Sequence, residues 1–244
     1  MSIKKAILFS VGLLLSQLTM AQVQAWGGGA DDNLVSFGFS FQYLLQDYKI
    51  VRQDNWRNPI IDPQNPNGTP LTTPITRISS RPSPGFTVGF ITRYRVAEHL
   101  EVRATPALVF ADREINYEFV NPSDNLNRQI QTTSIDMPLL LKLRSDRLKN
   151  FRAYLVGGVK YSLAVSKGKV DENEGPLQQK ILNKRGIGSY EAGIGCDIYF
   201  EYFKMSPEIK VANSFNSVLA GNVPLSAPLS KLFLHSIMFS LHFE

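Results

Sequence analysis

Eight stretches of this sequence alternate between apolar and polar residues with a period of two, and this pattern limits the possible folds more than any other feature. In the first stretch, 35–45, aromatic and aliphatic side chains at every second position are separated mostly by serine, glycine and glutamine. A period of two places the two sets on opposite faces of a strand, so each stretch predicts a β-strand with two different environments. The other seven stretches lie at 86–95, 100–110, 134–144, 151–162, 190–201, 203–211 and 233–243.

The connections between these stretches alternate in length. Short turns are expected around 97–99, 145–150 and 201–202, and long polar loops over 47–84, 112–131, 167–186 and 214–230. Each stretch has about the 9–11 residues that a tilted strand needs to cross a bilayer. In outer-membrane barrels, short turns face the periplasm and longer loops face outwards, and an even strand count leaves both termini inside. The sequence therefore predicts an all-β fold: an eight-stranded antiparallel transmembrane β-barrel with long extracellular loops and short periplasmic turns.

The two sets of side chains are predicted to face lipid and the barrel interior. Phe39, Leu139 and Ile194 belong to the apolar set, which is assigned to lipid. The polar set mixes glycines with charges of both signs, which favours a crowded interior over the water-covered face of a soluble sandwich or lipocalin-like barrel. Buried charges must pair to offset their lost hydration. The charged side chains predicted to point inwards are Arg93, Arg95, Glu101, Arg103, Asp136, Lys142, Arg144, Arg152, Lys160, Glu191, Asp197, Lys204, Glu208 and Lys210.

The first 25 residues have the pattern of an export signal rather than of a structural element. Lys4 and Lys5 precede a short apolar run, and cleavage is plausible after Ala21 or Ala25. Cleavage after Ala25 is preferred, which divides the chain into a signal peptide over 1–25 and an outer-membrane barrel over 26–244. Cys196 is the only cysteine, so lipid attachment at the cut and a disulfide framework are both excluded.

No catalytic, cofactor or metal site is expected from the residue pattern. His235 and His242 differ by seven positions and fall on opposite faces of one strand, while His99 lies in a turn. Inward carboxylates such as Glu191 are explained more simply by ion pairing than by acid–base catalysis. The basic residues, 26 against 21 acidic ones, are scattered and form no stripe for nucleic acid. Neither a nucleic acid nor a small-molecule substrate is expected as a partner.

The outer loops are the expected place of function, because eight strands enclose an interior that side chains fill and no channel remains. The longest loop, 47–84, contains Trp56 and seven prolines. Such a loop suits partner binding, although spacing and disorder explain it equally well. At the other end of the chain, Phe239, Leu241 and Phe243 are expected to close the barrel, and Glu244 is expected to be dispensable.

Several segments give this sequence a resemblance to a known family. They are the start Trp26-Gly27-Gly28-Gly29, the strand Leu34-Val35-Ser36-Phe37-Gly38-Phe39-Ser40-Phe41, and the segment Tyr43-Leu44-Leu45-Gln46-Asp47-Tyr48-Lys49-Ile50. Ser134-Ile135-Asp136-Met137-Pro138-Leu139-Leu140-Leu141-Lys142 and Tyr154-Leu155-Val156-Gly157-Gly158 look like motifs of the wider barrel superfamily. Over the whole mature chain the sequence resembles the PorT/SprT family of outer-membrane β-barrels from the type IX secretion and gliding machinery.

The resemblance implies a function without catalysis. It implies a component required for exporting cargo with a C-terminal sorting domain, such as secreted proteinases and adhesins. The implied partners are other type IX secretion components or their cargo, together with outer-membrane lipid; the resemblance offers no catalytic residues. A generic structural or adhesin barrel without a secretion role remains the alternative. A barrel enzyme is a third possibility, but no acid, base or nucleophile cluster marks one.

Overall fold

The computed structural model describes residues 33–62, 67, 70–165, 175–179, 181–220 and 223–244. The predicted signal peptide over 1–25 lies outside these residues and stays a prediction. Among the described residues, no helix combines the length and hydropathy needed to cross a membrane. The described chain is built almost entirely from antiparallel strands, joined by turns and two short 3₁₀ helices, η1 (Pro122–Asp124) and η2 (Pro224–Ser226).

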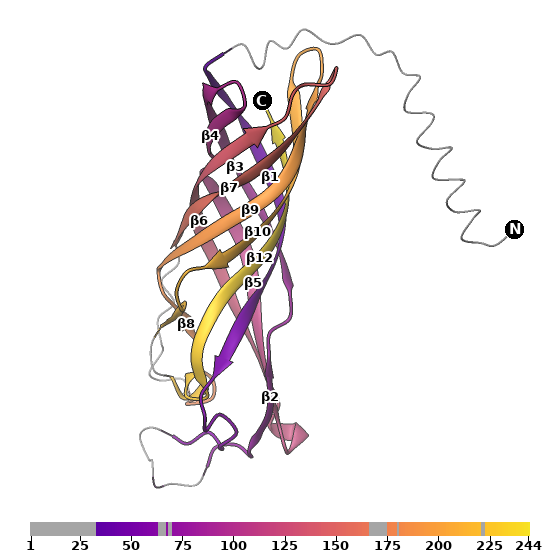
Figure 1. Cartoon of the computed structure of the whole chain (residues 1–244). Helices are drawn as coiled ribbons and strands as arrows, with labels where there is room; N and C mark the ends of the chain where they lie inside the picture. Colours follow the sequence, from indigo (N-terminus) through magenta and orange to yellow (C-terminus); the bar gives the residue numbers. More distant parts are fainter. Residues whose placement is uncertain (1–32, 63–66, 68–69, 166–174, 180, 221–222) are drawn as a thin grey trace, which may run out of the picture.

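In the described part of the chain, eight strands close into a ring of hydrogen bonds, as predicted (Figure 1). Two strands, β4 and β5, share one position in this ring and are interrupted at Thr105 and Pro106, where a proline cannot donate to the ladder. In ring order the strands are β1 (Val35–Arg52), β3 (Ser83–Ala97), β4 (Leu100–Ala104) with β5 (Ala107–Phe119), β6 (Leu126–Arg144), β7 (Phe151–Ala164), β9 (Gly186–Tyr199), β10 (Lys204–Ser214) and β12 (Leu229–Phe243).

The ring is closed by β1, which pairs with β3 on one side and with β12 on the other. Val35 lies opposite Tyr94 on β3, and Phe39 lies opposite Phe243 on β12. Both ladders are long, running over twelve and fourteen residue pairs. Neither the first nor the last strand of the ring is therefore left with an open edge across the barrel wall.

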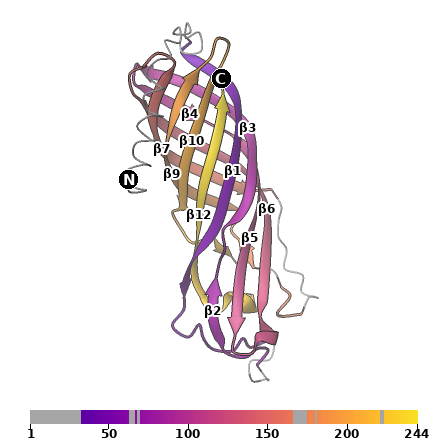
Figure 2. The ribbon, with the colours of Figure 1, turned by 90° about the vertical axis from the view of Figure 1, so that its right-hand side faces the viewer.

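The two ends of the barrel differ (Figures 1 and 2). One end, named here the turn end, carries the short connections β3–β4, β6–β7 and β9–β10, the beginning of β1 and the chain's last residue. The opposite end, named the loop end, carries η1, η2 and three short strands. These strands are β2 (Ile75–Ser79), which pairs with β5, and the pair β8 (Leu182–Asn183) and β11 (Leu219–Ala220).

The loop end is more regular than the sequence predicts. The expected loop over 112–131 is wrong, because β5 and β6 continue as a paired hairpin from Asp112 opposite Gln131 to Tyr117 opposite Leu126. The expected loop over 47–84 is also wrong in part, since β1 reaches Arg52 and β2 and β3 begin within it. The prediction failed because apolar and polar side chains still alternate with a period of two in both regions, but the apolar side chains point into the barrel instead of towards lipid.

An apolar core fills the barrel at the loop end. It gathers side chains from β1, β2, β5, β12 and the segments between them, and Leu225 of η2 and Leu232 are fully buried in it. Tyr117 donates a hydrogen bond from its hydroxyl to the Leu225 carbonyl at 2.7 Å, which ties η2 to the hairpin of β5 and β6. This region is named the cap. It comprises β2, β8, β11, η1, η2 and the parts of β1, β5, β6 and β12 at the loop end, and it is a packed unit that continues the barrel.

The lipid-facing band ends where the apolar side chains of a strand change from the outer face to the inner face. On β1 the outward side chains are apolar up to Leu45, and Asp47 and Lys49 follow. Outward Asp47 pairs with outward His235 on β12 at 2.8 Å, both about one quarter exposed. From Val35 to Leu45 a strand tilted by about 40° rises roughly 25 Å, which matches the height of the apolar band of outer-membrane barrels.

The predicted faces of the wall are confirmed. Phe39, Leu139 and Ile194 are 58%, 55% and 61% exposed on the outside, and most of the predicted inward charges are buried. Two of them, Arg95 and Arg152, are half-buried at the turn end.

An arginine in the middle of the outer wall should therefore destabilise the barrel. We expect Leu139→Arg to cost about 2–4 kcal/mol of folding free energy in lipid. The matched control is Tyr202→Arg, because Tyr202 is 89% exposed in the β9–β10 turn. Urea titration in lipid vesicles, followed by the heat-dependent shift in gel migration, measures both variants. Equal midpoints for the two variants would contradict the assignment of Leu139 to lipid.

Candidate functional site

Ion pairs occupy the interior of the barrel in the part of the chain that the structure describes. Midway along the wall, Arg103 bonds to Glu208, which also lies 3.4 Å from the Lys210 ammonium. Lys210 in turn contacts Glu191 at 3.3 Å. Lys160 lies 2.9 Å from Glu191 and 3.2 Å from Asp136. Three cations and three carboxylates therefore alternate around the inside of the barrel and balance in charge.

A second group of ion pairs lies nearer the turn end. The Glu101 carboxylate is shared by three cations, Arg93 at 2.5 Å, Arg144 at 2.6 Å and Lys142 at 3.7 Å. The Lys142 ammonium donates to both oxygens of Asp197, at 2.7 and 2.8 Å. These side chains are almost fully buried, so the inside of this half is also filled.

Glu244 has a role that the sequence does not suggest. Its carboxylate lies inside the barrel, 3.1 Å from Arg93 and 2.5 Å from Lys204, and its side chain is only 1% exposed. The backbone of Glu244 also exchanges two hydrogen bonds with Lys204. The expectation that Glu244 is dispensable does not fit this geometry, because its loss would remove one of the few carboxylates in a cation-rich region.

The three histidines lie apart, each beside a different carboxylate. His99 lies 3.0 Å from Asp146 in exposed turns, His235 pairs with Asp47 outside, and His242 lies 3.4 Å from Glu208 inside. This confirms that His235 and His242 occupy opposite faces of β12. Among the residues that the structure describes, no group of three or more His, Cys, Asp or Glu side chains could hold a metal ion.

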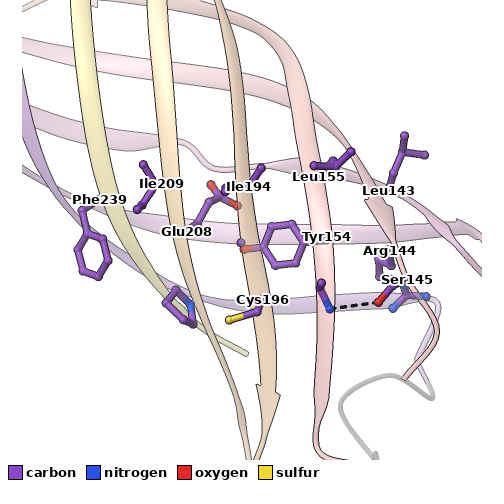
Figure 3. Close-up of a pocket in the computed structure, with 13 residues that line it drawn as sticks. Leu143, Arg144, Ser145, Tyr154, Leu155, Ile194, Cys196, Glu208, Ile209 and Phe239 are labelled. Atoms are coloured by element: carbon purple, nitrogen blue, oxygen red, sulfur yellow. Dashed lines mark hydrogen bonds between the residues drawn. The ribbon is translucent and has the colours of Figure 1, made fainter. Parts of the chain in front are cut away.

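The outer wall carries an apolar groove of about 670 Å³ near the turn end (Figure 3). One side of it is a row of large side chains that lie opposite one another on successive strands: Leu143, Leu155, Ile194, Ile209 and Phe239. The next row towards the turn end is small: Ser145, Ala153, Cys196 and Pro207. A further row of large side chains follows: Phe151, Ile198, Met205 and Phe243. The groove is the depression left by the small row.

The floor of this groove shows how the wall is supported from inside. Gly195 faces inwards, and a Cβ at this position would lie 2.5 Å from Cζ of Tyr154. The absence of a side chain at 195 thus leaves room for the Tyr154 ring, which in turn lies 3.9 Å from the Lys142 ammonium. Cys196 lies on the outer face as expected and is partly exposed. The outer row of large apolar side chains means that the groove offers apolar contact to a neighbouring molecule.

Side-chain hydrogen bonds attach the connection between β1 and β2 to η1 in the cap. Thr73 donates from both its N–H and its hydroxyl to Asp124, at 2.9 and 2.8 Å, and these bonds lower the pKa of the Asp124 carboxyl. The stabilisation by this contact requires the ionised Asp124 carboxylate. It is therefore fully present above the ordinary pKa of an aspartate and is lost as pH falls through the lowered pKa of Asp124. Two guanidinium groups, those of Arg52 and Arg57, lie over the Trp56 ring, at 4.7 and 5.2 Å from its centroid.

A comparison with known families connects this architecture to a group of proteins. The family described as "Outer membrane protein beta-barrel domain" matches residues 34–220, which is most of the chain. The chain belongs to this family. A comparison with curated proteins finds no match.

Solved structures of outer-membrane proteins are similar to this outer-membrane barrel at low sequence identity. OprG from Pseudomonas aeruginosa is 12% identical, with 86% of this chain and 92% of that chain covered and a TM-score of 0.47. Ail, the attachment invasion locus protein of Yersinia pestis, is 12% identical, with 85% and 96% covered and a TM-score of 0.34. AlkL, solved by solid-state NMR in DMPC bilayers, is 11% identical, with 92% and 93% covered and a TM-score of 0.37.

Membership of an outer-membrane barrel family assigns the two ends of the molecule. Short turns of such barrels face the periplasm, so the turn end is periplasmic and the cap is extracellular. The groove of Figure 3 then lies in the lipid-facing wall near the periplasmic surface. Three surfaces remain as candidates for contact with other molecules: the cap, the wall groove and the periplasmic mouth of the barrel.

Proposed function

We propose that this outer-membrane barrel is a non-enzymatic component of the type IX secretion system and is required for export of cargo with a C-terminal sorting domain. The sequence resemblance to the PorT/SprT family, carried by the opening segment and by the strand motifs, supports this role. The proposed partners are other type IX secretion components or the cargo itself. Outer-membrane lipid is the proposed neighbour of the wall and its groove.

The filled interior of the barrel supports a role that depends on contact with other molecules rather than on conduction. Among the described residues, ion pairs fill the inside of the barrel from the level of Glu101, near the periplasmic end, to the level of Asp136. The apolar core closes the extracellular end. A folded cargo protein cannot pass through a lumen occupied in this way. A role in export must therefore depend on contacts made by the outside of the molecule.

The cap is the surface best prepared for such contacts. The backbone of the described part of the cap is held by the β5–β6 hairpin, by β2 and by η2, so these residues need little further ordering when a partner binds. Ile61 and Val120 nevertheless remain exposed there, at 44% and 62%. Exposed apolar side chains on a rigid support are suited to a protein–protein interface.

The test compares apolar side chains at the two ends of the barrel. We expect the double variant Ile61→Asp/Val120→Asp to assemble normally but to lower cargo export by more than about tenfold, since charging a central contact costs about 2 kcal/mol or more. The matched control is Leu148→Asp/Tyr202→Asp, which changes exposed apolar residues of the periplasmic turns. Export is measured as the fraction of cargo outside the cell at equal barrel abundance. Loss of export only in the control would place the contact in the periplasm.

A generic structural or adhesin barrel is the second candidate, because the same exposed cap would suit attachment to another surface. Deletion of the whole protein separates the two functions. If cargo export is unchanged without the protein, the secretion role is excluded and the surface role remains.

A further inference from the structure

The wall groove of Figure 3 is a depression in the surface that faces lipid. Its bottom is the row of small outward side chains between two rows of large ones: Ser145, Ala153, Cys196 and Pro207. On the periplasmic side of the groove, the β9–β10 turn carries three exposed aromatic residues, Phe200, Tyr202 and Phe203. Aromatic residues of this kind mark the edges of the apolar band in outer-membrane barrels. The groove is therefore continuous with the wall that contacts acyl chains, and it begins at the periplasmic edge of that wall.

The width of the groove suits a single hydrocarbon chain. Outward side chains of one strand are two residues apart, so the centres of the two large rows are about 14 Å apart, and their own side chains take up much of this distance. An α-helix with its side chains is about 10–12 Å across, which is too wide for the space that remains. A partner strand finds no open edge to pair with in the described ring. The convex wall of a second barrel would bridge the groove rather than fill it.

The length and direction of the groove suit one leaflet of the membrane. The small row crosses the neighbouring strands β6, β7, β9 and β10, and three strand spacings of about 4.8 Å give about 14 Å. This length is close to half of the ~30 Å hydrocarbon core of a bilayer. Ser145 follows the last residue of β6 at the periplasmic surface, whereas Pro207 lies three residues inside β10. The groove thus leads from the periplasmic surface into the hydrocarbon.

The turn at the surface end of the groove carries positive charge. Lys149 is exposed in this β6–β7 turn and has no ion-pair partner among the described residues. The Arg147 guanidinium lies over the Tyr199 ring, 3.9 Å from its centroid, and adds a second cation. Asp146, the carboxylate of the same turn, lies 3.0 Å from His99. Lipid phosphate groups lie at the level of such turns and are attracted by exposed cations.

We propose that the wall groove is a binding site for one phospholipid of the periplasmic leaflet. One acyl chain lies along the small row, and the phosphate lies beside Lys149. This assignment rests on the proposed contact of the wall with lipid and names the lipid and its place. It does not depend on the secretion role, so unchanged export together with lost lipid binding would leave the two proposals separate.

Cys196 provides the first test, because it is the only cysteine of the chain and lines the groove (Figure 3). In detergent micelles, dioleoyl phosphatidylglycerol should slow the alkylation of Cys196 by N-ethylmaleimide severalfold. The matched control is Cys196→Ala/Val159→Cys, because Val159 is exposed on the outer wall and does not line the groove. Its alkylation rate should not change when the lipid is added. Equal slowing at both positions, or no slowing at Cys196, would overturn the proposal.

Native mass spectrometry provides the second test. We expect the parent to retain one phosphatidylglycerol molecule at collision energies that remove all others. Ala153→Phe fills the groove and should lower this retained fraction severalfold, as should Lys149→Glu at the phosphate, whereas Val159→Phe should not change it. Unchanged heat-dependent gel migration of each variant is the check on folding. Retention that survives either Ala153→Phe or Lys149→Glu would overturn the proposal, and a parent dimer that Ala153→Phe abolishes would assign the groove to a second copy of the chain instead.

Discussion

Deletion of residues 239–244 should abolish assembly of the barrel. These residues form the periplasmic end of β12, where Phe239 lies opposite Tyr43 and Phe243 lies opposite Phe39 on β1. On its other side the same segment pairs with β10, from Met205 to Ile209. Without it, β1 and β10 would each have an unpaired edge within the apolar band. Unpaired backbone groups cost several kcal/mol each in lipid, so a ring opened over this length cannot persist.

The measurement is the amount of folded, heat-modifiable protein in the outer membrane, which should fall to background. Deletion of Glu244 alone is the control that separates the ladder from its final side chain. That variant keeps the pairing of β12, but leaves Arg93 and Lys204 without their shared carboxylate. We expect it to assemble and to unfold at lower urea than the parent. Normal assembly of the longer deletion would show that closure does not use this strand.

The wall of the barrel could be predicted from the sequence because a single physical contrast, between lipid outside and paired charges inside, produces its alternating pattern of residues. Lipid outside and paired charges inside select opposite residue types, so segments such as 134–144 show a clear period of two. The break at Pro106 did not obscure the strand, because its apolar side chains stay in phase on both sides. Eight strands, their faces and the order of their connections followed from this pattern.

The cap could not be predicted in the same way, because above the membrane the apolar side chains of a strand face the core and the polar ones face water. Beyond Phe110, polar side chains from Asp112 to Glu118 face outwards, and Ile115 and Tyr117 turn inwards to the core. Residues 112–131 look like a polar loop when the lipid-facing pattern is extended unchanged. The available signal was a period of two that continues with its phase reversed, which separates a strand that leaves the membrane from a loop.

The site-level features depend on contacts between strands that are distant in sequence. The wall groove exists because Ser145, Ala153, Cys196 and Pro207 share a row, and this alignment requires the register of four strands. Likewise, Glu101 meets Lys142, and Lys142 meets Asp197, only after β4, β6, β7 and β9 have paired. The sequence indicated that the inward charges must pair, but not which charge pairs with which.

Asp197 provides the sharpest test of the interior ion pairs. Asp197 and Lys142 are both 0% exposed, and their contact is bidentate. In Asp197→Leu the Lys142 ammonium stays buried. Its remaining ion-pair partner among the described residues is Glu101 at 3.7 Å, which already binds Arg93 and Arg144. Breaking a buried pair by removing one partner typically costs about 3–5 kcal/mol, and we expect a loss of this size in the free energy of unfolding.

The double variant Lys142→Met/Asp197→Leu should recover most of that loss, because it removes both charges and leaves side chains that fill similar space. Replacing a buried ion pair by apolar residues of similar volume is often neutral, since neither charge then needs to lose its hydration. Ser206, which donates to Asp197 at 2.6 Å in the parent, loses an acceptor in both variants, so its effect cancels in the comparison. Urea titration in lipid vesicles of the parent, Asp197→Leu, Lys142→Met and the double variant gives four free energies of unfolding. If the double variant is as unstable as the sum of both single variants, the two charges act independently, and the interior is not held by specific pairs.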